Sequence, residues 1–547
     1  MQRSTLAKRG WLLFFLAAAA FYLYGLGHLP LVGPDEPRYA QVAREMYLRG
    51  DYVTPTLGGH TWFEKPALLY WMMMASYRLF GVSEWAARLG PALSGLLTAF
   101  LIYWMGSRIE RAAHAEKEAS DGFGLWSGVA LASSAGLIVF SRAASFDVVV
   151  TLTVTAALAC FFVAEIEGSE KQRRWLTAGF YAAIGASLLA KGLVGIVIPF
   201  GVVGLYYLMR REWPSRSLTL SALWGIPLAC AVAATWYAPV IARHGWTFVD
   251  EFFIQHHFAR FVSDKYHHPQ RFYFYLPIVL LLTLPWTALF IKGLASARHW
   301  KWREHSVESK SRVFALAWLV APIAFFSFSG SKLPGYILPA LPGAMLLVGE
   351  RLSRFVRDEE ESTGVRVTGA ILLVLALAGI VYAGRTGEIT ILCALIIATP
   401  LVIAGLFAIL LKQRRALRVE LICSAMFISI ALILNCGAER ISHRESVRDL
   451  MRQADTRGYS STPVFYMLTG DRTGEFYAGG RLGYKTDGEP FRFDGANEAA
   501  AAARQSGGTA LVFIPTKWEN LLTDYSAIET EVIGSNGVLT LAAIRVR

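Results

Sequence analysis

The sequence has little charge and little cysteine for its length, and both shortages exclude classes of protein. Charged residues make up only 17% of the 547 residues, against roughly a quarter in soluble proteins. Hydrophobic residues make up 54%, and the mean hydropathy of +0.40 indicates lipid as the solvent. The five cysteines lie inside or at the end of apolar runs and form no CxxC pair, so we expect neither a disulfide framework nor a cysteine metal or redox motif.

A nucleic-acid partner is not expected either, although the net charge is +12. Lys and Arg gather in short clusters beside apolar runs, as the positive-inside rule for membrane proteins predicts. The first cluster, Arg3, Lys8 and Arg9, precedes an apolar stretch that begins at Trp11. This stretch is longer than the core of a signal peptide and lacks a small-x-small cleavage site, so we expect it to be retained as the first membrane span.

Apolar segments of about 20 residues, the length of a spanning helix, recur along the chain as far as residue 436. We count thirteen, with approximate extents 11–29, 84–107, 123–140, 148–166, 175–190, 193–209, 217–240, 273–292, 313–329, 334–349, 367–384, 389–411 and 419–436. The basic clusters agree with a cytoplasmic N-terminus and thirteen crossings, which sends everything after Cys436 to the far side of the membrane. The segments around Lys191 and Lys332 divide least clearly, and eleven or twelve spans is the alternative.

Residues 437–547 differ in character from the preceding 436, because charges of both signs and glycines replace the long apolar runs. Short β-rich runs occur at Val464–Leu468 and Ala510–Pro515, and an alanine-rich helical stretch lies between them at Asn497–Gln505. The predicted fold is therefore an all-α polytopic membrane bundle over residues 1–436, with outer loops at 30–83 and 241–272, followed by a small soluble α/β domain.

The first outer loop carries the most conspicuous polar motif, GPDEPRYA, within residues 33–50. Apolar residues at helical spacing from Tyr39 to Tyr47 predict a short amphipathic helix along the membrane surface, ended by Gly50. One interpretation is structural, with Asp35 as the helix N-cap and Glu36 as an acid favoured by the helix dipole. A second charged motif in the same loop, FEKP at residues 63–66, favours a functional role, because charged pairs so near hydrocarbon are costly.

Five short motifs follow one another along the chain. They are PDEPRYA at 34–40, FEKP at 63–66, LLAKG at 188–192, QHHFARF at 255–261 and KLPGYILPALP at 332–342. Together they resemble the bacterial lipid-linked sugar transferases of the dolichyl-phosphate-mannose protein mannosyltransferase superfamily, a GT-C glycosyltransferase class. Within that class they are most similar to the transferases that modify lipid A with 4-amino-4-deoxy-L-arabinose.

The resemblance implies an inner-membrane enzyme whose active site faces the periplasm. The donor would be an undecaprenyl-phosphate-linked aminoarabinose and the acceptor a phosphate of lipid A, and the product would weaken the binding of polymyxin and other cationic peptides. The energy for transfer would reside in the donor, so no nucleotide is expected, and the sequence has no glycine-rich phosphate loop. Membrane lipids are the expected surroundings and the expected state is a monomer.

Two rival functions stay open at this point. One is transfer of mannose or another sugar from a polyprenyl phosphate to protein. The other is transport or flipping of lipid-linked sugars, for which ionisable residues would be expected at mid-membrane on broken helices. The charged motifs of this chain gather instead at the predicted outer ends of the spans, which favours the enzyme.

Three residues are candidates for the catalytic step. By resemblance, Asp35 occupies the place of the carboxylate that activates or orients the acceptor. Lys65 would stabilise the leaving phosphate by placing positive charge where negative charge develops. Asp147, at the predicted outer end between two spans, would bind the cationic amine of the sugar or the reaction centre, and the alternative is a helix N-cap before Val148.

Other polar residues on the same predicted side are assigned to substrate binding. They are Glu36, Arg38, Lys191, Arg260, Lys332 and Tyr336. For Lys191 and Lys332 the alternative is snorkelling at helix ends, and Arg38 has the alternative of pairing with a nearby acid. Tyr336, in the proline-rich turn, would donate to phosphate or belong to the interfacial aromatic belt.

A divalent metal is a further hypothesis. Glu64 and His256 are its candidate ligands, because carboxylate and imidazole together suit zinc, manganese or magnesium-type chemistry. The two residues lie in distant loops, and their spacing matches no metal motif.

Overall fold

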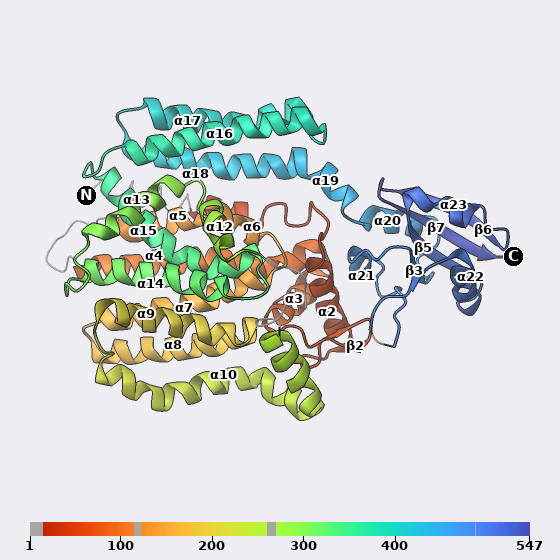
Figure 1. Cartoon of the computed structure of the whole chain (residues 1–547), viewed down its shortest axis with the longest axis horizontal. Coiled ribbons are helices and arrows are strands. Elements are labelled where there is room, and N and C mark those ends of the chain that lie inside the picture. The colour runs from red at the N-terminus through yellow and green to blue at the C-terminus, as the bar shows by residue number, and fades with distance from the viewer. Residues whose placement is uncertain (1–14, 114–121, 260–269, 487) are drawn as a thin grey trace. The chain divides into compact units, whose positions relative to one another are not determined.

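The computed structural model describes residues 15–113, 122–259, 270–486 and 488–547, and most of them are helical (Figure 1). The chain forms two compact units. The first comprises the described residues of Met1–Tyr24, Phe63–Leu69 and Arg88–Ile433. The second comprises Gly25–Trp62, Tyr70–Ala87 and Leu434–Arg547. The predicted C-terminal α/β region therefore shares its unit with two segments that come from near the N-terminus.

The first unit is a helical bundle whose helices coincide with the predicted spans. After a helix over residues 15–23 come α4 (Glu84–Ala113), α5 (Phe123–Ala132), α6 (Ala135–Ser141), α7 (Phe146–Ile166), α8 (Glu170–Lys191), α9 (Val194–Arg210), α10 (Arg216–Val249), η1 (Asp250–Ala259), η2 (Phe272–Phe274), α12 (Tyr275–Leu282), α13 (Thr287–Ala295), η3 (Ser296–His299), α14 (Val307–Ser327), η4 (Pro334–Ala340), α15 (Leu341–Val356), α16 (Thr363–Thr386), α17 (Ile391–Leu410) and α18 (Arg415–Leu432). The predicted class, a mostly helical polytopic bundle, is confirmed.

The number of crossings stays a prediction. Within the described ranges, seven helices are long and apolar enough to cross a membrane, or up to nine if each of two bent helix pairs is one span. The bent pairs are α5 with α6, at 54°, and Phe272–Leu282 with Thr287–His299, at 119°. Each pair overlaps one predicted span, 123–140 or 273–292, so the hydrophobic runs located the helices but not their bends.

Helices α7 and α8 are joined by a short loop and pack against each other, so the start of α7 lies beside the end of α8 (Figure 1). Ser145 is the N-cap of α7, and its hydroxyl accepts a hydrogen bond from the Asp147 N–H at 3.1 Å. Helix α8 ends at Lys191, where a lysine is favoured by the helix dipole and Gly192 takes a positive φ of 66°. The cap interpretation of Asp147 is therefore wrong, because Ser145 fills that role.

The cysteines differ from expectation in one respect. Cys393 and Cys436 are disulfide-bonded, whereas Cys160, Cys230 and Cys423 are free. The prediction of a chain without disulfides is wrong for these two residues. A lone pair of cysteines 43 residues apart in apolar runs gives no spacing signal, and only the packing of helices reveals which cysteines can react.

The second unit contains a five-stranded sheet with the strand order β4-β3-β5-β7-β6. Strand β3 pairs in parallel with β4 and β5, and β7 pairs antiparallel with both β5 and β6. The strands are β3 (Val464–Met467), β4 (Arg492–Phe493), β5 (Thr509–Pro515), β6 (Ile528–Ser535) and β7 (Leu539–Val546). The helices are α19 (Ala438–Arg444), α20 (Arg448–Thr456), α21 (Thr473–Tyr477), α22 (Ala496–Gln505) and α23 (Asn520–Thr523), with short turns η5 (Ile433–Gly437) and η6 (Thr516–Trp518).

Both faces of this sheet are covered. One face packs on α20 through Leu450 and Met451, and the other packs on the alanines of α22, such as Ala499 and Ala503. Strand β3 is buried throughout, as its apolar run predicts. The predicted soluble α/β region is therefore a packed sheet with helices on two sides.

The predicted helix of the first outer loop is α2 (Glu36–Arg49), and Gly50 ends it in the left-handed conformation. Its apolar side chains are buried inside the second unit. Tyr39, Val42 and Met46 are at most 5% exposed, and the Tyr39 ring lies 6.5 Å from that of Tyr70. The predicted amphipathic helix is confirmed, and its position along the membrane surface stays a prediction, because an amphipathic pattern gives the buried face but not what covers it.

Candidate functional site

Three residues from separate segments form what we call the lysine cluster: Asp147, Lys191 and Tyr336. The Lys191 Nζ donates to the Asp147 Oδ1 and lies 4.5 Å from the centre of the Tyr336 ring. Only 14% of the lysine side chain and 18% of the aspartate side chain are exposed. All three were predicted site residues, and a lysine held by a carboxylate and a ring is not a snorkelling residue.

Gly335 explains why the proline-rich turn carries a glycine beside Tyr336. A Cβ at this position would lie 2.1 Å from the Asp147 Oδ2 and 2.6 Å from the Phe140 ring. Contacts that short do not occur between real atoms, so the carboxylate occupies the space where a side chain would be. The turn and the start of α7 therefore fit together only with glycine here.

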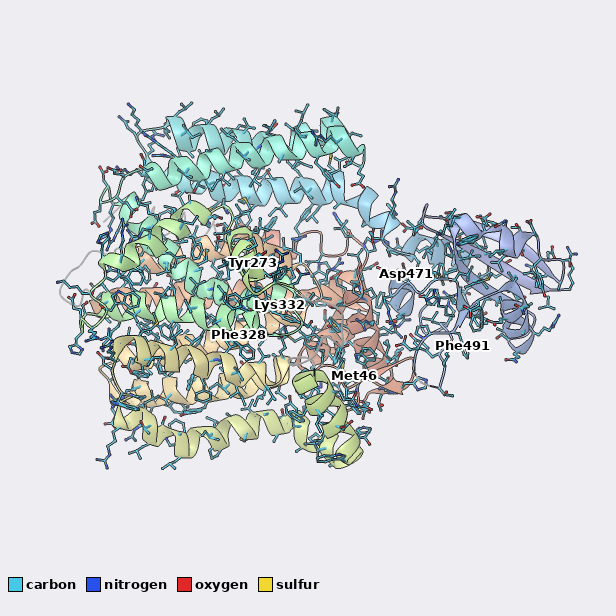
Figure 2. The ribbon with its side chains drawn as sticks, viewed as in Figure 1. Met46, Tyr273, Phe328, Lys332, Asp471 and Phe491 are labelled. Carbon is cyan, nitrogen blue, oxygen red and sulfur yellow. The ribbon has the colours of Figure 1, made fainter. Side chains whose placement is uncertain are left out.

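Lys332, at the start of the same turn, is 7% exposed and donates from Nζ to the Ser329 carbonyl oxygen at 2.6 Å (Figure 2). The nearby Phe328 ring lies 5.5 Å from the ring of Phe272. Lys332 is thus buried in the protein and is not a snorkelling residue at a lipid-facing helix end. No described contact joins it to Lys191.

Tyr275, at the start of α12, was not predicted. It is fully buried, and its hydroxyl interacts electrostatically with Tyr336 and Asp147. In the sequence it is one of four consecutive aromatic residues from Phe272, and nothing distinguishes it from its neighbours. Only the packing of α12 against α6 and η4 brings this hydroxyl to the lysine cluster.

The FEKP motif lies in the first unit. Glu64 and Lys65 form an ion pair at 2.7 Å, and both side chains are nearly buried, with 10% and 13% exposed. The preceding Phe63 packs edge-on against His244 and Phe248 at the end of α10, with ring centres 5.0 and 5.2 Å away. Gly245, with φ 55° and ψ −133°, breaks α10 between these two rings.

The metal hypothesis stays a prediction. Glu64 is paired with a cation, and the side chain of its predicted partner His256 lies outside the described residues, as does Arg260. Within the described part of the chain, no group of three or more His, Cys, Asp and Glu residues could hold a metal ion.

The acidic loop, residues 28–38, lies in the second unit and contains Asp35, Glu36 and Arg38. Asp35 occupies the N-cap position of α2, but its side chain makes no cap hydrogen bond. It accepts instead from the Arg38 Nη2 at 3.0 Å and is 49% exposed. The cap interpretation of the Asp35 side chain is therefore wrong, and half of the carboxylate faces outward.

The side chains of Glu36 and Arg38 bind backbone groups of the acidic loop rather than projecting away from it. Glu36 is 8% exposed, and its Oε2 accepts from the Val32 N–H at 3.2 Å. The Arg38 Nε donates to the Pro34 carbonyl at 2.7 Å, and its guanidinium lies over the Trp62 ring, 5.4 Å from the ring centre. Both predicted substrate-binding residues thus fix the backbone just before Asp35.

A further acid that no sequence motif marks, Glu45, organises the hairpin that follows α2. Its carboxylate accepts from the Gly58 N–H at 2.7 Å and from the Thr56 hydroxyl at 2.6 Å, within the hairpin of β1 (Thr56–Leu57) and β2 (His60–Thr61). An acid on the polar face of a helix is normally solvated, so the sequence carries no signal for this role.

The C-terminal part of the second unit contributes one buried acid. The Glu475 side chain in α21 is fully buried and pairs with the Arg472 Nη1 at 2.7 Å. Burial raises the pKa of the Glu475 carboxyl, and Arg472 opposes that rise. The Arg38 guanidinium also acts on this carboxyl, so α21 and the acidic loop interact electrostatically.

The chemistry available in the two units is complementary. The lysine cluster offers a partly buried ammonium paired with a carboxylate, and one tyrosine, with the Tyr275 hydroxyl nearby, and these groups suit a phosphate in an apolar setting. The acidic loop offers an outward-facing carboxylate, which suits an alcohol, an amine or a developing positive charge.

Comparison with known proteins gives the same class. A family model described as dolichyl-phosphate-mannose-protein mannosyltransferase matches residues 9–249. The chain is 33% identical over 383 residues to an undecaprenyl phosphate-alpha-4-amino-4-deoxy-L-arabinose arabinosyl transferase of Pseudomonas aeruginosa, covering 69% of this chain and 66% of that protein. It is 34% identical over 371 residues to the transferase of the same name from Aeromonas hydrophila, covering 65% and 62%. The aligned region thus spans just under two thirds of these relatives.

Solved structures of similar fold match this chain over nearly its whole length. The chain matches ArnT of Cupriavidus metallidurans in the apo state with a TM-score of 0.75 and 25% identity, covering 98% of both chains. The crystal structure of the same protein bound to undecaprenyl phosphate matches with a TM-score of 0.77 and 24% identity, again over 98% of both chains. With the apolar helices described above, these relatives indicate a multi-pass inner-membrane protein. The chain belongs to the GT-C glycosyltransferases of the dolichyl-phosphate-mannose-protein mannosyltransferase superfamily, and within them to the ArnT type.

Proposed function

We propose that this chain transfers 4-amino-4-deoxy-L-arabinose from undecaprenyl phosphate to a phosphate of lipid A at the periplasmic face of the inner membrane. The lysine cluster is the observation that carries the proposal. A cation held between Asp147 and Tyr336 among apolar helices suits a phosphate that arrives on a lipid chain. The relatives named for this activity support the choice of sugar and carrier.

The proposed reaction exchanges one phosphate ester for another. The bond between the anomeric carbon and the donor phosphate oxygen breaks, and a lipid A phosphate oxygen forms the new bond to that carbon. Undecaprenyl phosphate leaves with the electron pair of the broken bond. A phosphate monoester has its second pKa near ~6, so at neutral pH the acceptor oxygen is already anionic. One monoester is consumed and one is released, so no net proton transfer is needed.

Because the proposed reaction needs no net proton transfer, the residues would act by stabilising charge and by orienting the reactants. Lys191 would neutralise the charge that develops on the leaving phosphate, with Tyr336 as a hydrogen-bond donor. Asp147 would fix the position and orientation of the Lys191 ammonium. Lys65 and Lys332 are further candidate cations for either phosphate, and both have partners that a phosphate would have to replace or share.

Asp35 would act on positive charge rather than as an obligatory base. The transition state of sugar transfer carries oxocarbenium-like charge, and the amine of aminoarabinose is cationic near neutral pH. A carboxylate that is half exposed and held by Arg38 can stabilise or orient such a group.

The orientation proposed is a cytoplasmic N-terminus with the C-terminal sheet in the periplasm. The distribution of basic clusters supports it. The disulfide-bonded residues give independent support, since Cys393 near the start of α17 and Cys436 after α18 both fall at predicted outer ends. Disulfides persist in the periplasm and not in the cytoplasm.

One experiment tests the proposal directly. Purified protein is incubated with synthetic lipid-linked aminoarabinose and lipid A, and the lipid is analysed by mass spectrometry for a pentosamine adduct. We expect the adduct on a lipid A phosphate. Transfer from a mannosyl donor to a peptide, with no adduct on lipid A, would instead support protein glycosylation. Movement of the donor across vesicles without any adduct would support a flippase.

A further inference from the structure

The C-terminal sheet region makes hydrogen bonds to the segment that carries Asp35. Helix α21 packs on α2 within the second unit (Figure 1). The hydroxyl of Tyr477, the last residue of α21, accepts from the Leu31 N–H at 2.7 Å. The same hydroxyl donates to the Glu84 Oε1 at 3.2 Å. One side chain thus contacts two N-terminal segments that lie 446 and 393 residues before it in the chain.

A second side chain of the C-terminal region binds the first residue of the acidic loop. Arg448, the first residue of α20, is 7% exposed, and its Nη1 donates to the His28 carbonyl at 3.4 Å. The same Nη1 lies 3.7 Å from the Glu84 Oε1, so Glu84 receives both Arg448 and Tyr477. The Glu84 side chain is only 13% exposed, which limits exchange of these partners with water.

These bonds complete a series of backbone anchors that leads to Asp35. His28 and Leu31 are held by the C-terminal region, while Val32 and Pro34 are held by Glu36 and Arg38 of α2 itself. Glu36 and Arg38 can fix the loop only relative to α2. The C-terminal region is what fixes the entry of the chain into the loop.

The C-terminal region also covers the hairpin that follows α2. Gly58 has a φ of +61°, and a Cβ there would lie 2.4 Å from the Tyr484 ring. The Arg44 Nη1 of α2 donates to the Phe476 carbonyl at 3.4 Å. Contacts therefore run along the outer segment before, within and after α2.

We propose that the C-terminal α/β region positions the acidic loop for catalysis and that Tyr477 is a positioning residue. This inference rests on the proposed function in so far as Asp35 takes part in sugar transfer. Tyr477 acts through the Leu31 backbone, four residues before Asp35, and touches no reacting group. Its hydroxyl is the only part the role requires, because the ring packs on Phe476 in either case.

Removal of that hydroxyl has a specific expected effect. In Tyr477→Phe the Leu31 N–H loses its acceptor and Glu84 loses a donor, while the ring stays. A displacement of about 1 Å in a catalytic geometry costs about 100-fold in rate. We expect kcat for pentosamine transfer to fall at least tenfold, with the KM for the lipid-linked donor changed less than twofold.

Tyr459→Phe is the matched control. Tyr459 belongs to the same region, and its hydroxyl donates to the Glu531 Oε2 at 2.5 Å on the edge strand β6. Its loss removes two hydrogen bonds from the fold, the one to Glu531 and one that the hydroxyl accepts from the Arg545 Nη2 at 3.1 Å, without touching the acidic loop. The full-length protein in detergent is used for wild type and both variants, and the thermal midpoint, kcat and KM are measured for each. We expect similar losses of thermal midpoint and a loss of kcat only in Tyr477→Phe.

Hydrogen exchange gives a second measurement that does not depend on the reaction. We expect a peptide covering residues 28–38 to exchange faster in Tyr477→Phe than in wild type, and to be unchanged in Tyr459→Phe. An unchanged peptide in Tyr477→Phe, or an unchanged kcat with faster exchange, would overturn the positioning role. If kcat falls equally in both variants, the role is one of stability alone and the inference is wrong. If wild type shows no pentosamine transfer, the proposed function fails, and the exchange measurement still decides whether Tyr477 holds the loop.

Discussion

The two aspartates of the candidate sites are held in opposite ways. Asp147 is 18% exposed and pairs with Lys191, 44 residues away on the neighbouring helix. Asp35 is 49% exposed and pairs with Arg38, one turn along the same helix. The first pair exists only when the bundle is packed, whereas the second forms wherever α2 forms.

Asp147 therefore carries a charge that is part of the packed fold, whereas Asp35 carries a charge that a ligand can reach. Breaking a buried pair leaves an uncompensated charge and costs stability, while an exposed pair contributes little. A substitution of Asp147 or Lys191 should therefore affect both folding and transfer. A substitution of Asp35 should affect transfer alone.

Lys191→Met is expected to have the largest effect. The Asp147 carboxylate loses its partner, and we expect about 3–5 kcal/mol of destabilisation together with at least a ~100-fold loss of transfer. The apparent melting temperature in detergent and the adduct assay measure the two effects. In the double variant Asp147→Asn/Lys191→Met we expect stability to return toward wild type and transfer to stay lost. Wild-type stability in the single variant would mean that the pair is not buried in the protein.

Asp35→Asn should reduce transfer by about 100-fold or more while expression and membrane insertion stay normal. The loss of the exposed pair with Arg38 should change the free energy of unfolding by less than about 1 kcal/mol. The adduct assay and a membrane-fraction blot test the two parts. Unaltered turnover would show that this carboxylate has a structural role only.

Gly335→Ala tests whether the position of Asp147, and not only its charge, matters. The added methyl would lie 2.1 Å from the Asp147 Oδ2, so either the turn or the carboxylate must move. We expect a destabilisation of about 1–3 kcal/mol and roughly a tenfold loss of transfer. Gly379→Ala in α16 is the control, because no atom lies within 4 Å of its added Cβ, and we expect it to be neutral or slightly stabilising. Equal behaviour of the two variants would contradict the close fit.

Glu475→Gln should have the smallest effect, visible only in the pH dependence of stability. Burial raises the pKa of this carboxyl in the folded state above its ordinary value of 4.5. The folded protein then binds the proton more tightly than the unfolded chain. The stabilisation is complete at low pH and is lost as the pH rises through the folded-state pKa. Melting temperatures at pH 4.5 and pH 7 should therefore differ more in wild type than in the variant, and the opposite order would contradict the direction of the shift.

Much of the fold could be predicted because long apolar runs and β-rich runs are local signals. Helices α7 and α10 and strands β3 and β5 lie where their patterns placed them. The bend between α12 and α13 and the segments that cover the apolar face of α2 were not predictable, because each depends on which segment packs against it. The interleaving of the two units is invisible in the sequence for the same reason.

For the candidate sites, the sequence predicted several of the residues that belong to them but not which of these residues contact one another. Asp147, Lys191 and Tyr336 were selected as polar residues at outer ends of apolar runs, yet nothing in their spacing indicates that they touch. Tyr275, Gly335, Glu45 and Tyr477 have ordinary residue types in ordinary surroundings, and only the packed structure reveals them. Arg260 and the side chain of His256 lie outside the described residues, so their predicted roles stay predictions.

The interleaved second unit has a consequence for the order in which the protein is made. Its first segment ends at Trp62 and its last begins at Leu434, so roughly 370 residues must be synthesised between them. The partners of His28 and Leu31 follow them by 420 and 446 residues, so at ~5–20 residues per second the acidic loop waits about 20 to 90 s for them. During that interval Leu31 and His28 lack Tyr477 and Arg448, and a prematurely terminated chain would never acquire them. Completion of translation is thereby a condition for a fully anchored acidic loop.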